Sequence, residues 1–346
     1  MKRLVGIAAV LTLGLAAGLA VTSLGAIGTR GDVVPATSPT VSSEPSPTGV
    51  PVHGAVTAGI PPSIAPGPIL PRMNNGPLTL FGFLNAVKQV DTNGAFHKPL
   101  IQCGGSCTVI TSASWTADGT KLAFAVESCC AGGTAGDPYH GIRVLDVRTG
   151  KDRLIAPGED FGVLDWSPDW TRIAFTDGSE PFIMNADGSN VKPIPVMGIA
   201  QIESIAWSPD GTSIAYSTDR KMYVEGVDGS SPNALGSGRD PDWAPDGMRI
   251  AYASADRCQV WTMSPDGTHR TKVAQVTPRP HRPDTCSPAI QIPWQPGPPG
   301  PTWSPDGRMI AFISGRGLFT VNRDGSDFRR VSAADPYEGI AWRPVR

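Results

Sequence analysis

Trp207-Ser208-Pro209-Asp210-Gly211, followed by Thr212-Ser213-Ile214-Ala215-Tyr216, is the stretch that decides the fold, because it recurs along the chain. Complete, degenerate or truncated copies begin at five other tryptophans: Trp115, Trp166, Trp243, Trp303 and Trp342. The six tryptophans are 36 to 60 residues apart. Repeats of about this length, each holding several short strands, are typical of a propeller or a similar closed array.

The residue types of the motif predict a tight turn between two strands. Pro presets the backbone at the first central position, Asp can hydrogen-bond its own backbone, and Gly accepts the positive φ that closes the hairpin. The following Ile-Ala-Tyr run predicts a strand in which the small Ala allows a neighbouring sheet to pack closely, and the Trp fills the space between sheets. A second Asp-Gly turn follows each motif, for example Asp228-Gly229. Each unit therefore has four strands, which we call a to d in chain order.

Counting the units predicts an all-β, six-bladed propeller. The piece 76–101 supplies strands b, c and d without a Trp motif, with Phe83–Val90 and Ala95–Ile101 as the last two strands. The piece 337–344, which contains Trp342, supplies a strand a with nothing after it. Pairing these two pieces completes the sixth blade and leaves no open seam in the ring.

Composition agrees with many short strands and argues against one class of partner. The chain has 346 residues, with 40 Gly and 35 Pro, as expected for an all-β protein rich in turns. Only 17% of the residues are charged and the net charge is -2. No basic field exists to attract nucleic acid, so we expect no nucleic-acid partner.

At these residues the chain resembles the TolB-type propeller, whose repeat carries Trp-Ser-Pro-Asp-Gly-x-x-Ile-Ala-Phe/Tyr. The resemblance covers residues 76–346 and implies an extracytoplasmic, six-bladed platform for protein interactions. We expect the propeller to be a monomer. Two features depart from relatives with this repeat. The separate N-terminal domain of TolB is absent, and so are a peptidase half and its Gly-x-Ser-x-Gly motif. The resemblance therefore implies a fold and no role in a Tol system.

The N-terminal segments predict export and a tether. Lys2 and Arg3 precede an uncharged run to Thr29, so residues 1–29 are a signal peptide or a signal-anchor helix. Residues 30–75 are rich in Pro, Ser and Thr, and they predict a disordered tether because they bury too little apolar surface. The propeller at 76–346 would then lie outside the cytoplasm, held at the membrane or secreted if the leader is cleaved.

Strand parity assigns the connections to two faces. The short a–b and c–d turns lie on one face, here called the turn face. The b–c and d–a connections lie on the other, here called the loop face, and include the long stretches 127–140 and 277–300. All six cysteines fall on the loop face, and export favours disulfides there. Cys258 and Cys286 leave the same blade, so we expect them to pair; the other four cross-pair in an order that the sequence leaves open: Cys103, Cys107, Cys129 and Cys130.

Candidate binding residues fall mainly on the loop face. Tyr139 and His140 lie in one long connection, and His281 and Trp294 lie in the other. Asp165 and Asp242 directly precede a blade tryptophan, and either line the centre of the ring as acids or cap local backbone groups. We identify no catalytic constellation, metal site or cofactor, since the repeated aspartates lack the Asp-x-Asp-x-Asp-Gly pattern of calcium loops.

Three functions follow from these features. The first is a non-enzymatic module of the cell envelope that binds a protein or peptide. The second is an exported hydrolase or lyase that uses acids and histidines with a metal ion at the mouth of the central channel. The third is a carbohydrate- or wall-binding module with exposed tryptophans.

Overall fold

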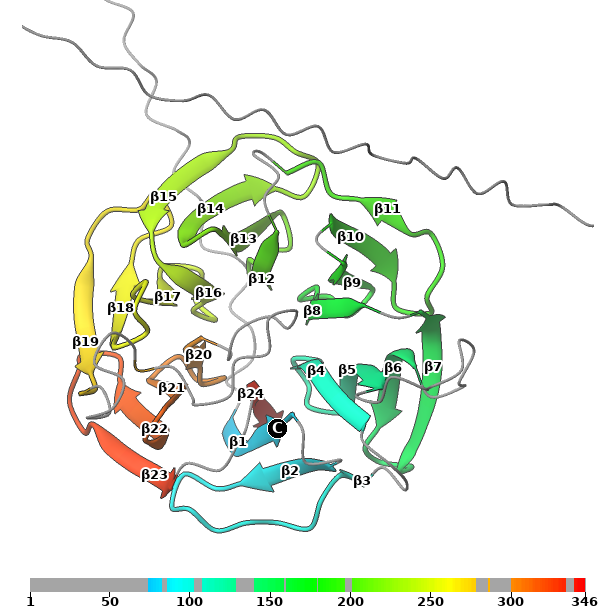
Figure 1. Cartoon of the computed structure of the whole chain (residues 1–346), viewed down its shortest axis with the longest axis horizontal. Coiled ribbons are helices and arrows are strands. Elements are labelled where there is room, and N and C mark those ends of the chain that lie inside the picture. Colours follow the sequence, from blue (N-terminus) through cyan, green and yellow to red (C-terminus); the bar gives the residue numbers. More distant parts are fainter. Residues whose placement is uncertain are drawn as a thin grey trace, which may run out of the picture. The chain divides into compact units, whose positions relative to one another are not determined.

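The fold is a ring of six four-stranded antiparallel sheets, seen in a computed structural model of the chain (Figure 1). The structure describes residues 74–82, 86–102, 108–128, 140–158, 160–178, 180–196, 201–277, 286, 300–333 and 339–345. All of them belong to one compact unit, Pro61–Arg346. Within this part of the chain, no helix has the length and apolar character needed to cross a membrane.

Blades 1 to 3 each follow one tryptophan motif in chain order. Blade 1 contains β4 (Thr108–Trp115), β5 (Lys121–Ser128), β6 (Gly141–Asp146) and β7 (Lys151–Pro157). Blade 2 contains β8 (Phe161–Trp166), β9 (Arg172–Asp177), β10 (Glu180–Asn185) and β11 (Lys192–Pro193). Blade 3 contains β12 (Ile202–Trp207), β13 (Ser213–Thr218), β14 (Lys221–Gly226) and β15 (Asn233–Ser237).

Blades 4 to 6 complete the ring. Blade 4 contains β16 (Arg239–Trp243), β17 (Ile250–Ala253), β18 (Gln259–Met263) and β19 (Thr271–Gln275). Blade 5 contains β20 (Thr302–Trp303), β21 (Met309–Ser314), β22 (Gly317–Asn322) and β23 (Arg329–Ala333). Blade 6 joins β24 (Gly339–Val345) to β1 (Asn74–Phe81), β2 (Ala86–Val90) and β3 (Ile101–Gln102).

Blade 6 confirms the closure predicted from the sequence. β24 from the C-terminal end pairs antiparallel with β1 from the N-terminal end, with Leu78 opposite Trp342. The expected last strand of this blade, Ala95–Ile101, is wrong in extent. The structure has only an isolated bridge between Val90 and Phe96 and the two-residue strand β3. Pro99 explains part of this break, because it cannot donate a backbone hydrogen bond to the ladder.

The motif turn forms as its residue types predict, and its serine has a further role. The Asp210 Oδ1 atom accepts the backbone N–H of Thr212 at 3.0 Å, and Gly211 has a φ of 73°. Ser208 Oγ donates to Asp210 Oδ1 at 2.6 Å and accepts the N–H of Ser213 at 2.9 Å. The serine therefore connects the turn carboxylate to the first residue of strand b.

The core is divided into six apolar layers, one between each pair of neighbouring blades. In each layer the tryptophan of one blade meets strand b of the blade before it. Trp207, for example, lies in one cluster with Ala174 of blade 2, and Trp243 lies in one cluster with Ala215 of blade 3. The indole ring of the next blade thus packs against the Ala of the Ile-Ala-Phe/Tyr run. A small side chain is needed at this position, here called the seat, to leave room for the ring.

The seat between blades 6 and 1 differs, because Thr79 occupies the position that Ala has elsewhere. Its hydroxyl accepts the indole N–H of Trp115 at 2.9 Å. In four other layers the buried indole N–H has no protein acceptor in the described structure: Trp166, Trp207, Trp243 and Trp303. The seam between blades 6 and 1 therefore has an acceptor for the buried indole N–H, which these four seams lack in the described structure.

We expect Thr79→Ala to destabilise the propeller by about 1 to 2 kcal/mol, because it leaves the buried indole N–H of Trp115 without its acceptor. Thr79→Ser is the matched control, since it keeps the hydroxyl and removes one methyl group. Urea unfolding of the three proteins measures the difference. Equal losses for Ala and Ser would show that the hydroxyl contributes nothing to closure.

Candidate functional site

The residues that directly precede the blade tryptophans form a ring on the inner strands, which surround the centre of the propeller in Figure 1. In blade order this column of the repeat reads Ser114, Asp165, Ala206, Asp242, Thr302 and Ala341. Only the two aspartates of this ring were predicted from the sequence. Aligning the residue before each Trp as a column would also have found Ser114 and Thr302.

The polar members of the ring bind the backbone of the next blade. Asp165 Oδ2 accepts the N–H of Trp207 at 2.8 Å, and Asp242 Oδ2 accepts the N–H of Trp303 at 2.7 Å. Ser114 Oγ donates to Asp165 Oδ1 at 2.7 Å, so Asp165 joins three consecutive blades. Strand a is an edge strand whose inner N–H groups have no ladder partner, and these side chains supply acceptors for them.

Both aspartates titrate well above the ordinary range for a carboxyl group. Burial raises the pKa of Asp165 to about 6, although hydrogen bonds from Trp207 and Ser114 oppose the shift. Burial raises the pKa of Asp242 to about 7, and the negative charge of Asp165 adds to the rise. The structure shows the second of the two roles expected from the sequence, since both carboxylates accept backbone N–H groups.

We expect the propeller to lose stability as the pH rises from about 4 to about 7. Asp242 has a folded pKa of about 7, above the ordinary 3.8, so its protonated form is favoured by folding. That contribution is present below pH 3.8 and lost as the pH rises through 7. Its size is about 1 to 2 kcal/mol, because part of the side chain remains accessible.

Asp242→Asn tests this expectation, since the amide oxygen still accepts the Trp303 N–H but carries no charge. Thermal unfolding between pH 4 and pH 8 should show a smaller fall for the variant than for the natural protein. Asp210→Asn is the control, because Asp210 lies in the a–b turn of blade 3 and its pKa is lowered, not raised. Identical pH profiles for Asp242→Asn and the natural protein would contradict the assignment.

A second cluster lies where strand a begins in blades 3 and 4, on the loop face. Glu203 of β12 and Arg239 of β16 form an ion pair with 2.5 Å between Oε2 and Nη1. Asp240 pairs with Arg257 from the b–c turn of blade 4, and both side chains are largely buried. Burial raises the pKa of Asp240, opposed by the charges of Arg257 and Arg239. We call Glu203, Arg239, Asp240 and Arg257 the four-charge cluster.

The backbone of the four-charge cluster is unusual. Asp240 and Arg257 have φ angles of 52° and 58°, a left-handed conformation that glycine or asparagine adopts more readily. Strained residues persist where their side chains have a role to perform, and a buried ion pair contributes little net stability by itself. The chain reaches Asp240 again at Gly300, where an added Cβ would lie 2.1 Å from the Asp240 Cβ. The cluster therefore lies against the C-terminal end of the long 277–300 connection.

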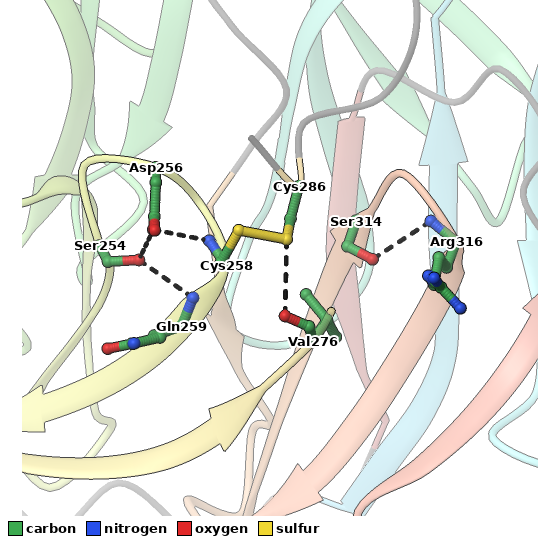
Figure 2. The surroundings of a disulfide bond; sticks show 8 residues. All are labelled: Ser254, Asp256, Cys258, Gln259, Val276, Cys286, Ser314 and Arg316. Carbon is green, nitrogen blue, oxygen red and sulfur yellow. Dashed lines mark hydrogen bonds between the residues drawn. A yellow bond between two sulfur atoms is a disulfide. The ribbon is translucent and has the colours of Figure 1, made fainter. Parts of the chain in front are cut away.

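The Cys258–Cys286 disulfide, the pair expected from the sequence, fixes the other described point of that connection (Figure 2). Cys286 also donates its N–H to Asp256 O at 3.1 Å, and its carbonyl accepts the N–H of Gly315 at 2.6 Å. Asp256 and Gly315 lie in the b–c turns of blades 4 and 5. Through these two hydrogen bonds Cys286 joins neighbouring blades on the loop face, and it is only 4% exposed.

A third group lies at the loop-face end of blade 1. Burial raises the pKa of Glu127 to about 7, and the charge of Asp160 adds to this rise. Val126 of β5 pairs with Gly141 of β6. Glu127 and His140 are the residues adjacent to this pair, one on each segment. His140, a candidate binding residue from the sequence, is 8% exposed and therefore buried. Glu127 and Asp160 could not be predicted from the sequence, because their proximity depends on the packing of blade 1 against blade 2.

Several candidates from the sequence lie outside the described residues: Tyr139, His281, Trp294, Cys103, Cys107, Cys129 and Cys130. Trp170, which replaces the turn glycine of blade 2, is partly buried against the core between blades 1 and 2. Among the described residues, no group of three His, Cys, Asp or Glu side chains is placed to hold a metal ion.

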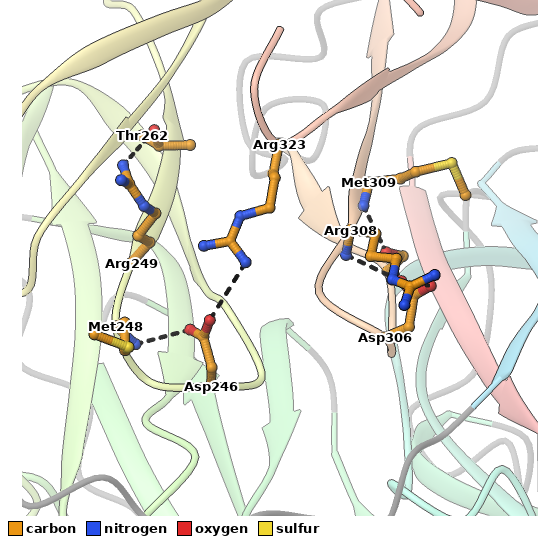
Figure 3. A network of polar contacts seen from close by, with 9 residues as sticks. Asp246, Met248, Arg249, Thr262, Asp306, Arg308, Met309 and Arg323 are labelled. Carbon is orange, nitrogen blue, oxygen red and sulfur yellow. Dashed lines mark hydrogen bonds and ion pairs between the residues drawn. The ribbon is translucent and has the colours of Figure 1, made fainter. Parts of the chain in front are cut away.

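On the turn face the aspartates are engaged by their own turns. The hydroxyls of Ser189 and Ser326, and then the backbone N–H groups of the same serines, lower the pKa of Asp187 and Asp324. Between blades, Asp246 approaches Arg323 at 3.7 Å, while Asp306 accepts the N–H of Arg308 in its own turn (Figure 3). These contacts account for the repeated aspartates by turn formation.

One exposed aromatic ring on this side of the blades also has a structural explanation. Phe328 is 43% exposed, and its ring stacks on Phe312 and Phe319 with centroid distances of 6.1 and 5.5 Å. Arg270 covers Tyr252 in the same way in blade 4, at 5.5 Å. In blades 4 and 5 the residue before strand d thus covers aromatic side chains of strands b and c. The exposure of Phe328 alone does not indicate a docking surface.

These features define the class of the protein, which is a six-bladed β-propeller with four-stranded blades. No family model matches the sequence, and no curated protein matches it. Solved structures do match. A chain of the nidogen/laminin complex superimposes with a TM-score of 0.59 at 12% identity, covering 78% of this chain and 98% of the other.

Two further solved structures are similar. A protein described as a TolB from Agrobacterium tumefaciens has a TM-score of 0.53 at 18% identity, covering 77% of this chain and 91% of that one. An oligogalacturonate lyase in complex with manganese has a TM-score of 0.46 at 16% identity, covering 69% and 71%. At these identities the first two structures show a common fold and nothing further.

Proposed function

We propose that this chain is an extracytoplasmic propeller, held at the membrane by its N-terminal segment, that binds a protein or peptide partner through the loop face. We further propose that its repeats are of the TolB type, on the strength of the Trp-Ser-Pro-Asp-Gly copies and the likeness of fold to a TolB structure. Propellers of similar shape can take part in protein assemblies, as the nidogen/laminin complex illustrates.

The observation that carries the proposal is the contrast between the two faces. On the turn face, carboxylates such as Asp187 and Asp324 are engaged by hydrogen bonds within short, regular turns. On the loop face, the four-charge cluster lies close to Gly300 and the disulfide holds Cys286, two described points of the long 277–300 connection. Long irregular connections on a rigid scaffold are where binding residues are usually found.

Site-specific photo-crosslinking tests which face binds the partner. A crosslinking amino acid replaces Arg220, in the exposed b–c turn of blade 3, or Met248, in the exposed a–b turn of blade 4. In envelope extracts we expect one discrete crosslinked product from position 220 and none from position 248. Products from position 248 alone, or the same products from both positions, would overturn the proposal.

The membrane tether is tested separately, by fractionation and N-terminal sequencing of the mature protein. Recovery in the membrane fraction with an intact N-terminus supports a signal anchor. A mature chain that begins after residue 20 and is found in the soluble fraction would show that the leader is cleaved and that the protein is secreted.

A catalytic alternative rests on Glu127, whose pKa of about 7 suits proton transfer near neutral pH. His140 directly precedes β6, beside the Val126–Gly141 pair, and the charge of Asp160 at the start of blade 2 acts on Glu127. This alternative expects turnover of an envelope polymer that Glu127→Gln abolishes while the fold is kept. Unchanged turnover in that variant would remove Glu127 from any reaction.

A further inference from the structure

The chain contains two Asn-Gly pairs, Asn75-Gly76 and Asn93-Gly94. Their surroundings in the structure differ in ways that affect deamidation of the asparagine. In such a pair the glycine nitrogen can attack the asparagine side-chain carbonyl carbon, forming a C–N bond and releasing ammonia. Water then opens the five-membered imide to aspartate or to isoaspartate, in which the main chain runs through the side-chain carbon. Glycine favours the first step because it has no Cβ to obstruct the approach.

Asn75 is protected by its surroundings. It lies in β1 opposite Pro344 of β24, and its Oδ1 atom accepts the N–H of Asp306 at 3.2 Å. Gly76 is packed so closely that an added Cβ would lie 2.5 Å from the carbonyl oxygen of Arg343. Imide formation needs the side chain to leave its partner and the backbone to rotate, and both movements would break the strand pairing that closes the ring.

Asn93 lies in an exposed c–d turn whose hydrogen bonds are all local. Its Oδ1 atom accepts the N–H of Ala95 at 2.9 Å, and the Gly94 N–H donates to Asp91 O at 2.9 Å. The strand that follows this turn is the two-residue β3, whereas β7 of the next blade has seven residues. A short outer strand has few backbone bonds to break, so this hairpin opens at a low free-energy cost.

In the described structure, blade 6 lacks a contact that other blades have, namely the packing of the glycine of the next blade's c–d turn against them. In blades 2 to 6 the glycine of the c–d turn lies close to the blade before it; an added Cβ on Gly188, for example, would lie 1.9 Å from Ile155 O of blade 1. The corresponding glycine of blade 1, Gly150, has nothing within 4 Å. Among the described residues, the c–d turn of blade 1 therefore lacks this glycine contact with blade 6.

We propose that Asn93 is a site of spontaneous deamidation in the folded protein, while Asn75 is not. The aspartate product restores the residue that other c–d turns carry. Asp187 and Asp324 occupy the same position, and each accepts the N–H two residues later at 2.9 Å, as Asn93 does. The aspartate product therefore fits the turn without rearrangement.

The isoaspartate product does not fit. It adds one methylene group to the main chain immediately before Gly94. An added Cβ at Gly94 would already lie 2.8 Å from Val331 O, on the outer strand of blade 5, so the turn has no room to expand in that direction. Isoaspartate formation is therefore expected to loosen the contact between blades 5 and 6.

Peptide mapping by mass spectrometry tests the site. The full chain is incubated in mildly alkaline buffer, folded or unfolded in urea, and the two Asn-Gly peptides are followed in time. We expect conversion at Asn93 alone in the folded protein and conversion at both pairs in the unfolded chain. Conversion of Asn75 as fast as Asn93 in the folded protein, or no conversion of Asn93 there, would overturn the proposal.

A matched variant tests the consequence. Asn93→Asp should fold with the same amide-exchange protection at Asp91–Ala95 as the fresh protein, because it carries the residue of the other blades. Aged protein enriched in isoaspartate should show faster exchange at those amides and at Val331. Equal protection in the aged and variant proteins would show that the isoaspartate form is tolerated, and would overturn the loosening between blades 5 and 6.

Discussion

Gly119→Ala is expected to destabilise the propeller by about 3 to 5 kcal/mol, the largest effect of any single change considered for this chain. Gly119 ends the a–b turn of blade 1 with a φ of 67°. A Cβ there would lie 1.8 Å from the carbonyl oxygen of Pro344 in β24. The obstacle is backbone in the strand that closes the ring, so relief requires the closing seam itself to move.

Local contacts show why this seam cannot yield easily. The carbonyl of Gly119 accepts a hydrogen bond from Arg343 Nε at 3.3 Å, and the Arg343 guanidinium lies 5.0 Å from the centre of the Trp115 ring. Moving the turn away from β24 would separate this arginine from both partners. The loss therefore combines steric overlap with the positive φ, which costs alanine about 1 to 2 kcal/mol.

Gly247→Ala is the matched control, because Gly247 has the same place in the motif of blade 4. Its φ is 70°, and nothing lies within 4 Å of the position that a Cβ would take. We expect it to lose only the 1 to 2 kcal/mol due to backbone strain. Urea unfolding at one pH measures both variants. Similar losses for the two would mean that the approach to Pro344 does not limit stability.

Replacement of both Cys258 and Cys286 by serine is expected to cost about 3.5 kcal/mol. The two cysteines are 28 residues apart, and a cross-link of this span reduces the entropy of the unfolded chain by about that free energy. Equilibrium unfolding of the oxidised natural protein and the double variant measures the difference. A difference below about 0.5 kcal/mol would show that the unfolded state gains little freedom when the bond is absent.

The same variant also has a local signature. Cys286 holds the b–c turns of blades 4 and 5 through its backbone bonds to Asp256 and Gly315. Loss of the disulfide should therefore speed amide exchange at Cys286 and Gly315, while amides in β9 of blade 2 keep their protection. A uniform loss of protection in all blades would indicate global destabilisation without local release.

Much of the fold could be predicted from sequence because the motif encodes local chemistry. Pro, Asp and Gly specify a turn through backbone angles and short-range hydrogen bonds, so each copy marks a hairpin wherever it occurs. Counting the copies predicted six blades and the pairing of the N-terminal and C-terminal strands that closes the ring. The failure at Ala95–Ile101 has the same origin, because no turn signal marks where an outer strand stops pairing.

The candidate site was predicted only in part. Asp165 and Asp242 were found by their places beside the tryptophans, and the Cys258–Cys286 pair by blade parity. Glu127 with Asp160, and Asp240 with Arg257, were missed because each pair joins residues brought together by neighbouring strands, turns or blades. Left-handed angles at Asp240 and Arg257 were also unforeseen, since no local sequence preference requires them there.

The sequence alone determined the hairpins, the number of blades, the pieces that close the ring and the face on which each connection lies, because these depend on neighbouring residues and on strand parity. Only the tertiary structure determined the packing contacts and hydrogen bonds between blades. It showed that Ala174 and Ala215 seat the next tryptophan, that Asp165 and Asp242 bind the next blade's backbone, and that Asn75 is shielded while Asn93 is exposed. Burial, pKa shifts and close approach depend on distances between blades, and these are set by how six separate sheets pack around one axis.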